Sequence, residues 1–234
     1  MAVLLLRLSG PLQSWGDGSR FVRRETRLLP TKSGVIGLLA AALGRRRTDP
    51  IEDLVQLRFG VRQDQAGSLQ RDFQTAIDWR SGRSLPLSQR YYVGDARYLA
   101  LVEGETNLVD GLAEAVRSPA FPLYLGRRSC PPDGRLVIGV EDQSIEEALE
   151  TTRWLASERY RRRQPTEVRL LWSRDAAVGE AVDESSRDVP LSFDQRDRQY
   201  GLRDVVHGWT RPFANPVGRP GLGHDALALL GGGA

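Results

Sequence analysis

The chain has 234 residues, 40% of them hydrophobic and 27% charged, a composition typical of a globular protein with one substantial core. Cys130 is the only cysteine, which excludes an intrachain disulfide and a cysteine-based zinc site. The apolar run from Val3 to Leu6 is interrupted by Arg7, is too short to span a membrane and lacks a signal-peptide cleavage pattern. We therefore expect a cytoplasmic protein with no membrane partner.

The charge of the chain permits a nucleic-acid partner without predicting one. The formal net charge is only +3, which many proteins share. Lys32 is the only lysine among 33 basic residues, and guanidinium groups suit phosphates and base planes. Because a GC-rich coding sequence produces the same arginine bias, the bias is not an argument for RNA binding.

The first elements in chain order are a strand, a helix, a short helical stretch and a second strand. Residues 2–8 form an apolar run bounded by Ser9, Gly10 and Pro11, which predicts a central strand. Pro30 and Thr31 predict a helix start, and the helix is expected to continue to a stop at Gly44. Residues 51–57 read as a short helix and residues 59–62 as the second strand.

A long connection then interrupts this pattern. Residues 67–87 are polar and rich in turn formers, with isolated hydrophobic residues at Phe73, Ile77 and Trp79. Compact domains rarely keep a connection of this length unless it has a function. A disordered surface loop is the alternative.

The next elements complete a repeated unit. Residues 98–102 predict a third strand, residues 108–117 a helix capped by Asn107, and residues 135–140 a fourth strand. The order βαββαβ predicts an α+β fold of the ferredoxin-like, or RRM-like, type over residues 1–140.

A small, mainly β extension is expected over residues 141–212. Ser144 begins a capping-box helix that runs to about residue 152, and residues 168–172 and 189–193 read as strands. The acidic segment 175–188 between these strands is expected to be mobile, and residues 213–234 are expected to form a flexible tail. The arginine run 159–163 is either a solvated face or a phosphate track.

The start of the predicted helix at Thr31 is a candidate anion site. The free amides of its first turn, the helix dipole, the Lys32 ammonium and the Ser33 hydroxyl together suit a phosphate. An ordinary solvated first turn is the alternative. A nucleotide-binding P-loop is excluded, because residues 27–30 replace the glycine-rich run that it requires.

Two loops strengthen the case for RNA. Residues 10–16, GPLQSWG, place Trp15 on a loop where its ring could meet a base, and residues 124–132, YLGRRSCPP, place an aromatic ring and paired guanidinium groups on a turn. Together with PTKSGVIGLLAAALG at residues 30–44, these motifs occur in an order and spacing that resemble the CasD family. That family comprises type I-E Cascade subunits of the RAMP superfamily of CRISPR-associated proteins, and the resemblance is good over roughly residues 2–140.

The resemblance implies a non-catalytic subunit that binds the 5′ handle of the CRISPR RNA (crRNA) in a Cascade surveillance complex. It implies a protruding thumb inserted at about residues 67–90, with Trp79, Arg80 and Arg83 as its candidate contacts. The implied partners are the crRNA handle, the backbone subunit next to the thumb, the large subunit and, indirectly, target DNA; no cofactor is implied. The candidate RNA-binding residues are Gln13, Ser14, Trp15, Arg24, Lys32, Ser33, Arg90, Tyr124, Arg127, Arg128 and Ser129.

Two rival functions stay open at this stage. A metal-independent endoribonuclease that processes precursor crRNA needs a general base and acid, most often histidine, and only His207 and His224 exist. A protein-binding adaptor that never touches RNA is the second rival. The expected RNA site requires Lys32 and Arg127, far apart in the sequence, to meet as one anion cradle.

Overall fold

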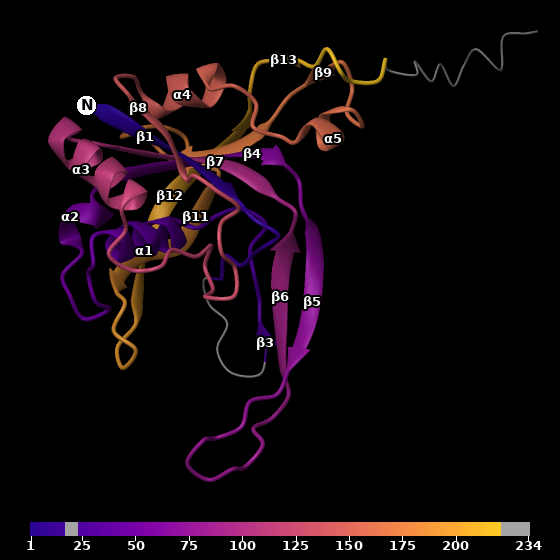
Figure 1. Cartoon of the computed structure of the whole chain (residues 1–234). Helices are drawn as coiled ribbons and strands as arrows, with labels where there is room; N and C mark the ends of the chain where they lie inside the picture. The colour runs from indigo at the N-terminus through magenta and orange to yellow at the C-terminus, as the bar shows by residue number, and fades with distance from the viewer. Residues whose placement is uncertain (17–22, 221–234) are drawn as a thin grey trace, which may run out of the picture.

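The computed structural model describes residues 1–16 and 23–220, and its main feature is a seven-stranded antiparallel sheet (Figure 1). The sheet has the order β11-β12-β10-β4-β7-β1-β8. Its strands are β1 (Ala2–Ser9), β4 (Arg58–Gln65), β7 (Arg97–Gly104), β8 (Val137–Glu141), β10 (Leu171–Asp175), β11 (Glu184–Ser192) and β12 (Gln199–Trp209). The helices are α1 (Lys32–Ala42), α2 (Glu52–Val55), α3 (Thr106–Arg117), α4 (Ile145–Thr151) and α5 (Glu158–Arg161).

Strand β1 lies inside the sheet and is buried on both faces. Leu4, Leu6 and Leu8 belong to the main core, which also contains the apolar residues of α1 and α3. Val3 and Leu5 point to the other face, in a second cluster with residues of α4. A continuous apolar run is what a strand covered on both faces needs, because neither set of alternating side chains meets water.

Most of the predicted elements of the first 140 residues are present. The strands β4, β7, β1 and β8 are neighbours in that order, and α1 and α3 follow β1 and β7 in the sequence. Thr31 caps α1 as predicted, and its hydroxyl accepts from the Gly34 amide. The cap of α3 is Glu105 instead of Asn107, because the Glu105 carboxylate accepts from two first-turn amides.

The C-terminal part is not an appended extension, since its strands widen the main sheet. β10 pairs with β4, β12 pairs with β10, and β11 forms the edge. The segment 175–188, expected to be a mobile connection, is partly strand, because β10 ends at Asp175 and β11 already begins at Glu184. The eleven-residue strand β12 has no counterpart among the predicted elements.

The expectation of a flexible tail from residue 213 is wrong for its first residues, which are bonded to the body of the molecule. β13 (Phe213–Ala214) pairs with β9 (Glu167–Val168), and Asn215 is fully buried. Residues 221–234, including His224, lie outside the described residues. None of the helices in the described part of the chain is long and apolar enough to cross a membrane.

A second, four-stranded sheet carries a long hairpin that projects from the body of the molecule (Figure 1). β5 (Ser68–Gln74) and β6 (Ser88–Gly94) are antiparallel, and β2 (Leu12–Gln13) and β3 (Arg23–Arg24) both pair with β6. In the segment that connects these two strands, an isolated antiparallel bridge joins Ile77 to Ser84. The region expected to be either a thumb or a disordered loop is thus a structured hairpin, called the projecting hairpin below.

A fully buried ion pair fixes α4 and the segment after it to β4. The Arg62 guanidinium contacts the Asp64 carboxylate through Nε at 2.8 Å and through Nη2 at 3.0 Å, and both side chains are inaccessible. Arg62 also donates to the Leu149 and Arg153 carbonyls, at 2.5 and 3.1 Å. Asp64 accepts from the Leu155 amide at 2.6 Å. Every side-chain nitrogen and oxygen atom of the pair therefore has a hydrogen-bond partner, and three of these bonds reach the segment at residues 149–155.

We expect Arg62→Met to lower the free energy of unfolding by about 3–5 kcal/mol, because the Asp64 carboxylate would stay buried without its counter-charge. Urea denaturation followed by circular dichroism measures this loss. Arg117→Ala is the control, since the exposed Arg117–Glu114 pair contributes less than about 1 kcal/mol. Equal losses in the two variants would contradict the role assigned to Arg62.

Candidate nucleic-acid interface

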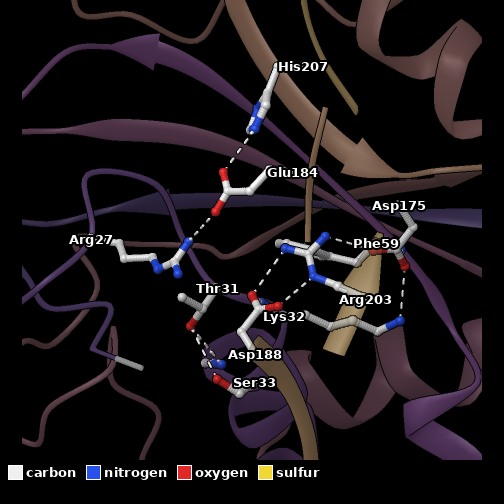
Figure 2. Close-up of polar contacts among 11 residues, drawn as sticks. Arg27, Thr31, Lys32, Ser33, Phe59, Asp175, Glu184, Asp188, Arg203 and His207 are labelled. Atoms are coloured by element: carbon white, nitrogen blue, oxygen red, sulfur yellow. Dashed lines mark hydrogen bonds and ion pairs between the residues drawn. The ribbon is translucent and has the colours of Figure 1, made fainter. Parts of the chain in front are cut away.

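The start of α1 is occupied by the chain's own carboxylates (Figure 2). Asp188 of β11 accepts from the Lys32 backbone amide at 2.8 Å, and the Lys32 ammonium contacts Asp175 of β10 at 2.9 Å. The Ser33 hydroxyl donates to Thr31 Oγ1 at 3.3 Å. Lys32 and Ser33 are each only 6% exposed. The start of α1 does bind an anion, but this anion is the Asp188 carboxylate, which lies where a phosphate was expected.

Arg203 of β12 joins the two carboxylates into one network. Its guanidinium donates to Asp188 at 2.6 and 3.0 Å and to Asp175 at 2.7 Å. Burial alone would lower the pKa of Arg203, but the hydrogen bonds and charges of Asp188 and Asp175 outweigh burial and raise it. Asp175 also accepts from the Phe59 amide at 2.9 Å. The network ties α1 and β4 to the C-terminal strands.

The loop motif at residues 10–16 is structural. Trp15 is 1% exposed and lies in the main core, with its indole N–H donating to Gln13 Oε1 at 3.1 Å. Gln13 is fully buried and donates to the Ala96 carbonyl at 2.8 Å, and Ser14 is buried against the Tyr91 carbonyl. The expectation that Trp15 offers an exposed ring to a base is wrong, because the ring packs against α1.

Two glycines allow this packing. A Cβ at Gly34 in α1 would lie 2.8 Å from the Trp15 ring, so only glycine leaves room for the indole. Gly126 has a φ of +85°, and a Cβ there would lie 1.7 Å from the Ser14 carbonyl oxygen. The Ser14 amide donates to the Leu125 carbonyl at 3.0 Å. The three sequence motifs thus interlock, with the loop at residues 12–15 between α1 and the turn at residues 124–132.

Arginines gather where this turn meets the base of the projecting hairpin. Arg127 donates to the Tyr91 carbonyl at 3.1 Å and to the Arg24 carbonyl at 3.0 Å, and its guanidinium lies 4.8 Å from the Tyr92 ring centroid. The pairing of β3 with β6 places Arg24 opposite Arg90. Arg128 and Ser129 are exposed on the same turn, and Tyr124 at its start is half-buried. Arg24, Arg90, Arg127 and Arg128 are called the basal arginine cluster.

The structure does not form the single cradle expected from Lys32 and Arg127. The Lys32 ammonium is directed to Asp175, whereas Arg127 is directed to carbonyls of β3 and β6. Trp15 packs against the first turn of α1, and the neighbouring Ser14 packs against Gly126, so these two loop residues lie between the predicted halves of the site. Direct RNA contacts by Lys32 or Ser33 stay an untested prediction.

The far part of the projecting hairpin exposes large apolar side chains among polar ones. Trp79 is 84% exposed and Ile77 is 70% exposed. The Arg80 guanidinium lies 5.1 Å from the Trp79 ring centroid, and Arg83 is also exposed. Exposed aromatic and aliphatic side chains of this size on one hairpin mark an interaction surface.

The one histidine within the described residues, His207, lies on β12 and is not a member of the basal arginine cluster. His207 Nε2 is 3.3 Å from Glu184 Oε2, and Glu184 also contacts Arg27 (Figure 2). Over residues 1–16 and 23–220, no group of three or more His, Cys, Asp or Glu side chains is placed to hold a metal ion.

Comparisons with known proteins agree with this architecture. Residues 3–206 match the model of a family described as CRISPR-associated protein (Cas_Cas5). The chain is 36% identical over 156 residues to the CRISPR system Cascade subunit CasD of Escherichia coli (strain K12). The aligned region covers 58% of this chain and 70% of that protein.

Two solved structures share the whole arrangement. A chain described as "Crystal structure of Cas protein" has a TM-score of 0.70 and 37% identity, over 94% of this chain and 98% of its own. A chain from a "CRISPR RNA-guided surveillance complex" has a TM-score of 0.73 and 30% identity, over 94% and 95%. A mixed α/β fold dominated by antiparallel sheet is thus shared with CRISPR-associated proteins of known structure. The chain belongs to the Cas5 family of CRISPR-associated proteins, in which CasD of Cascade is its relative.

We expect Gly126→Ala to lower the free energy of unfolding by more than about 2 kcal/mol, because the new Cβ both clashes with Ser14 and requires a positive φ. Hydrogen exchange at the Ser14 amide is expected to accelerate, since its acceptor lies on the displaced turn. Gly111→Ala is the matched control. Nothing lies within 4 Å of a Cβ at Gly111, and alanine in the α3 helix is expected to stabilise by about 0.5–1 kcal/mol.

Proposed function

We propose that this protein is a non-catalytic crRNA-binding subunit of a type I-E Cascade surveillance complex, that it holds the 5′ handle of the guide, and that it acts in the cytoplasm. Membership of the Cas5 family and 36% identity to CasD support the proposal. The observation that carries it is the interlocking of the loops at residues 12–15 and 124–132, which presents arginines at the base of a projecting hairpin. We also infer that β4-β7-β1-β8 with α1 and α3 is the ferredoxin-like unit expected from the sequence.

The exposed members of the basal arginine cluster are assigned to the handle phosphates. Arg24 and Arg128 are exposed, and guanidinium groups bind phosphate oxygens in a bidentate manner. Arg127 is partly exposed and keeps its place through backbone carbonyls, so it adds positive charge without having to reorganise. Tyr124 begins the same turn and is half-buried, and its ring is assigned to stacking on a splayed base, which is how proteins read single-stranded RNA.

The projecting hairpin is assigned to contacts within the complex. Its exposed Trp79, with Arg80 alongside, fits a contact with the neighbouring backbone subunit and with the guide where handle and spacer meet. The large subunit is a second proposed protein partner, and target DNA is reached only through the assembled complex.

The surroundings of His207 and Lys32 support a non-catalytic role. RNA cleavage without a metal needs a base and an acid placed at the same phosphate. His207 contacts Glu184, and the only lysine is buried in an ion pair with Asp175. The precursor-processing endoribonuclease is therefore the less favoured assignment.

We expect the double variant Arg24→Gln with Arg128→Gln to weaken binding of a handle RNA oligonucleotide. The slope of log Kd against log salt is expected to become shallower by about 1.4, because two contacts to single-stranded phosphates are lost. Fluorescence anisotropy of the labelled oligonucleotide with the full chain measures both quantities. Denaturing gels of the same samples without metal are expected to show intact RNA.

Arg46→Gln with Arg47→Gln is the charge-matched control, since this exposed pair follows α1 at the end away from Lys32. The control is expected to keep the wild-type slope. Equal losses in both double variants would reduce the effect to net charge and reject the basal cluster as the handle site, and cleaved RNA would reject the non-catalytic assignment.

We expect Trp79→Ser to abolish co-purification with the other subunits of the complex while changing the free energy of unfolding by less than about 0.5 kcal/mol, because the ring is outside the core. Trp209→Ser is the matched control, as Trp209 is also exposed but lies on β12. If the Trp79 variant assembles as well as the Trp209 variant, the hairpin is not the assembly contact.

A further inference from the structure

Helix α5 is a rigid support for an arginine cluster that the proposed handle site does not use. Ser157 caps α5 by accepting from the Tyr160 amide at 3.2 Å. The Tyr160 ring meets the Trp154 ring edge to face, with centroids 6.5 Å apart, and the Arg161 guanidinium lies 5.2 Å from the Trp154 centroid. Ser157 also donates its amide to Gln65 at 3.0 Å, which anchors α5 at the end of β4.

A distant segment is locked beside α5 and contributes one more arginine. The buried Asn215 donates its side-chain amide to the carbonyls of Arg161 and Pro165, both at 2.8 Å. The Arg219 amide then donates to the Gln164 carbonyl at 2.9 Å. Arg219 is thereby placed next to the end of the arginine run.

The segment of α5 and the segment around Arg219 border an open cavity of about 420 Å³. Its lining residues are Glu158, Arg159, Arg162, Arg163 and Arg219. Glu158 forms an ion pair with Arg162. Arg159, Arg163 and Arg219 have no carboxylate partner within the described part of the chain. The cavity therefore concentrates positive charge that the folded protein does not neutralise.

This concentration of charge is unfavourable unless an anion is bound. Like charges held close together on a fixed support repel one another and raise the local positive potential. Where the chain uses arginines for stability it partners them, as Arg62 with Asp64 and Arg203 with Asp175 and Asp188. The lack of partners around α5 thus points to a binding surface.

The shape and place of the surface indicate the kind of anion. An open cavity lined by flexible guanidinium groups suits a chain of phosphates rather than one enclosed ion. α5 lies near the root of the projecting hairpin strands, at the end of the molecule away from the hairpin's far loop (Figure 1). It is held by residues 154–165 and 215–219, none of which takes part in the basal arginine cluster.

We propose that Arg159, Arg162, Arg163 and Arg219 form a second nucleic-acid site, which binds the phosphodiester backbone of a strand other than the handle and does so independently of base sequence. Arg159 and Arg163 supply unpaired charges from one segment and Arg219 from the other. Glu158 limits the affinity by pairing with Arg162. The site needs no movement of the core, because its supports are already hydrogen-bonded.

The test uses the full chain with two probes, a short mixed-sequence DNA duplex and a single-stranded RNA without handle sequence. For Arg159→Gln with Arg163→Gln, affinity for the bound probe at low salt is expected to fall roughly tenfold, and the slope of log Kd against log salt to become shallower by about 1.8 for duplex DNA or about 1.4 for single-stranded RNA. Arg46→Gln with Arg47→Gln, which removes the same charge elsewhere, is expected to bind like the wild type. If affinity falls with only one of the two probes, that probe identifies the type of strand that the site binds. A loss with either probe supports the site.

A gain-of-function variant keeps the test independent of folding. Glu158→Gln removes the only carboxylate among the described residues that line the cavity, so affinity is expected to rise about twofold to threefold. The same loss in the α5 double variant is expected when a saturating handle RNA oligonucleotide is present, which separates this site from the handle site. The proposal is overturned if the α5 double variant and its charge-matched control lose affinity equally, or if neither loses any.

Discussion

The buried network of Lys32, Asp175, Asp188 and Arg203 is the interaction on which the rest of the structure depends. It joins the start of α1 to three strands that come more than 140 residues later, with Asp188 bonded to the Lys32 amide across 156 positions. Because each charge is desolvated, each needs its partners, and loss of any one would leave an uncompensated buried charge. The network therefore makes β10, β11 and β12 part of the core fold.

The same physics explains why a helix start with the chemistry of a phosphate site holds an internal carboxylate here. The dipole and free amides at an N-terminus attract any anion, and the Asp188 carboxylate is tethered at high local concentration. The three motifs that identify the family thus act chiefly as supports. Trp15 and Gly126 shape the loops, and the exposed guanidinium groups beside them are those of Arg24 and Arg128.

Arginine serves two purposes in this protein, and its environment separates them. Arg62 and Arg203 are buried and saturated with carboxylates and carbonyls, which holds layers together. The arginines of the basal cluster and of α5 are attached to structured loops but direct charge outward. A chain of modest net charge can in this way place arginines on two exposed surfaces while other arginines hold its layers together.

The sequence by itself determined the local elements and the family. Apolar runs, the Thr31 and Ser144 caps and the spacing of three motifs depend only on neighbouring residues, and they identified β1, α1, α4 and the resemblance. Tertiary structure alone decided which polar residues are buried. Asp175 and Asp188 read as a solvated acidic stretch, and Trp15 as an exposed ring, until pairing of β10 with β4 and packing of α1 covered them. Contacts between residues so distant in sequence do not appear in the hydrophobic periodicity of the sequence. The burial of these side chains depends on which strand or helix packs on them and not on the pattern of their own segment.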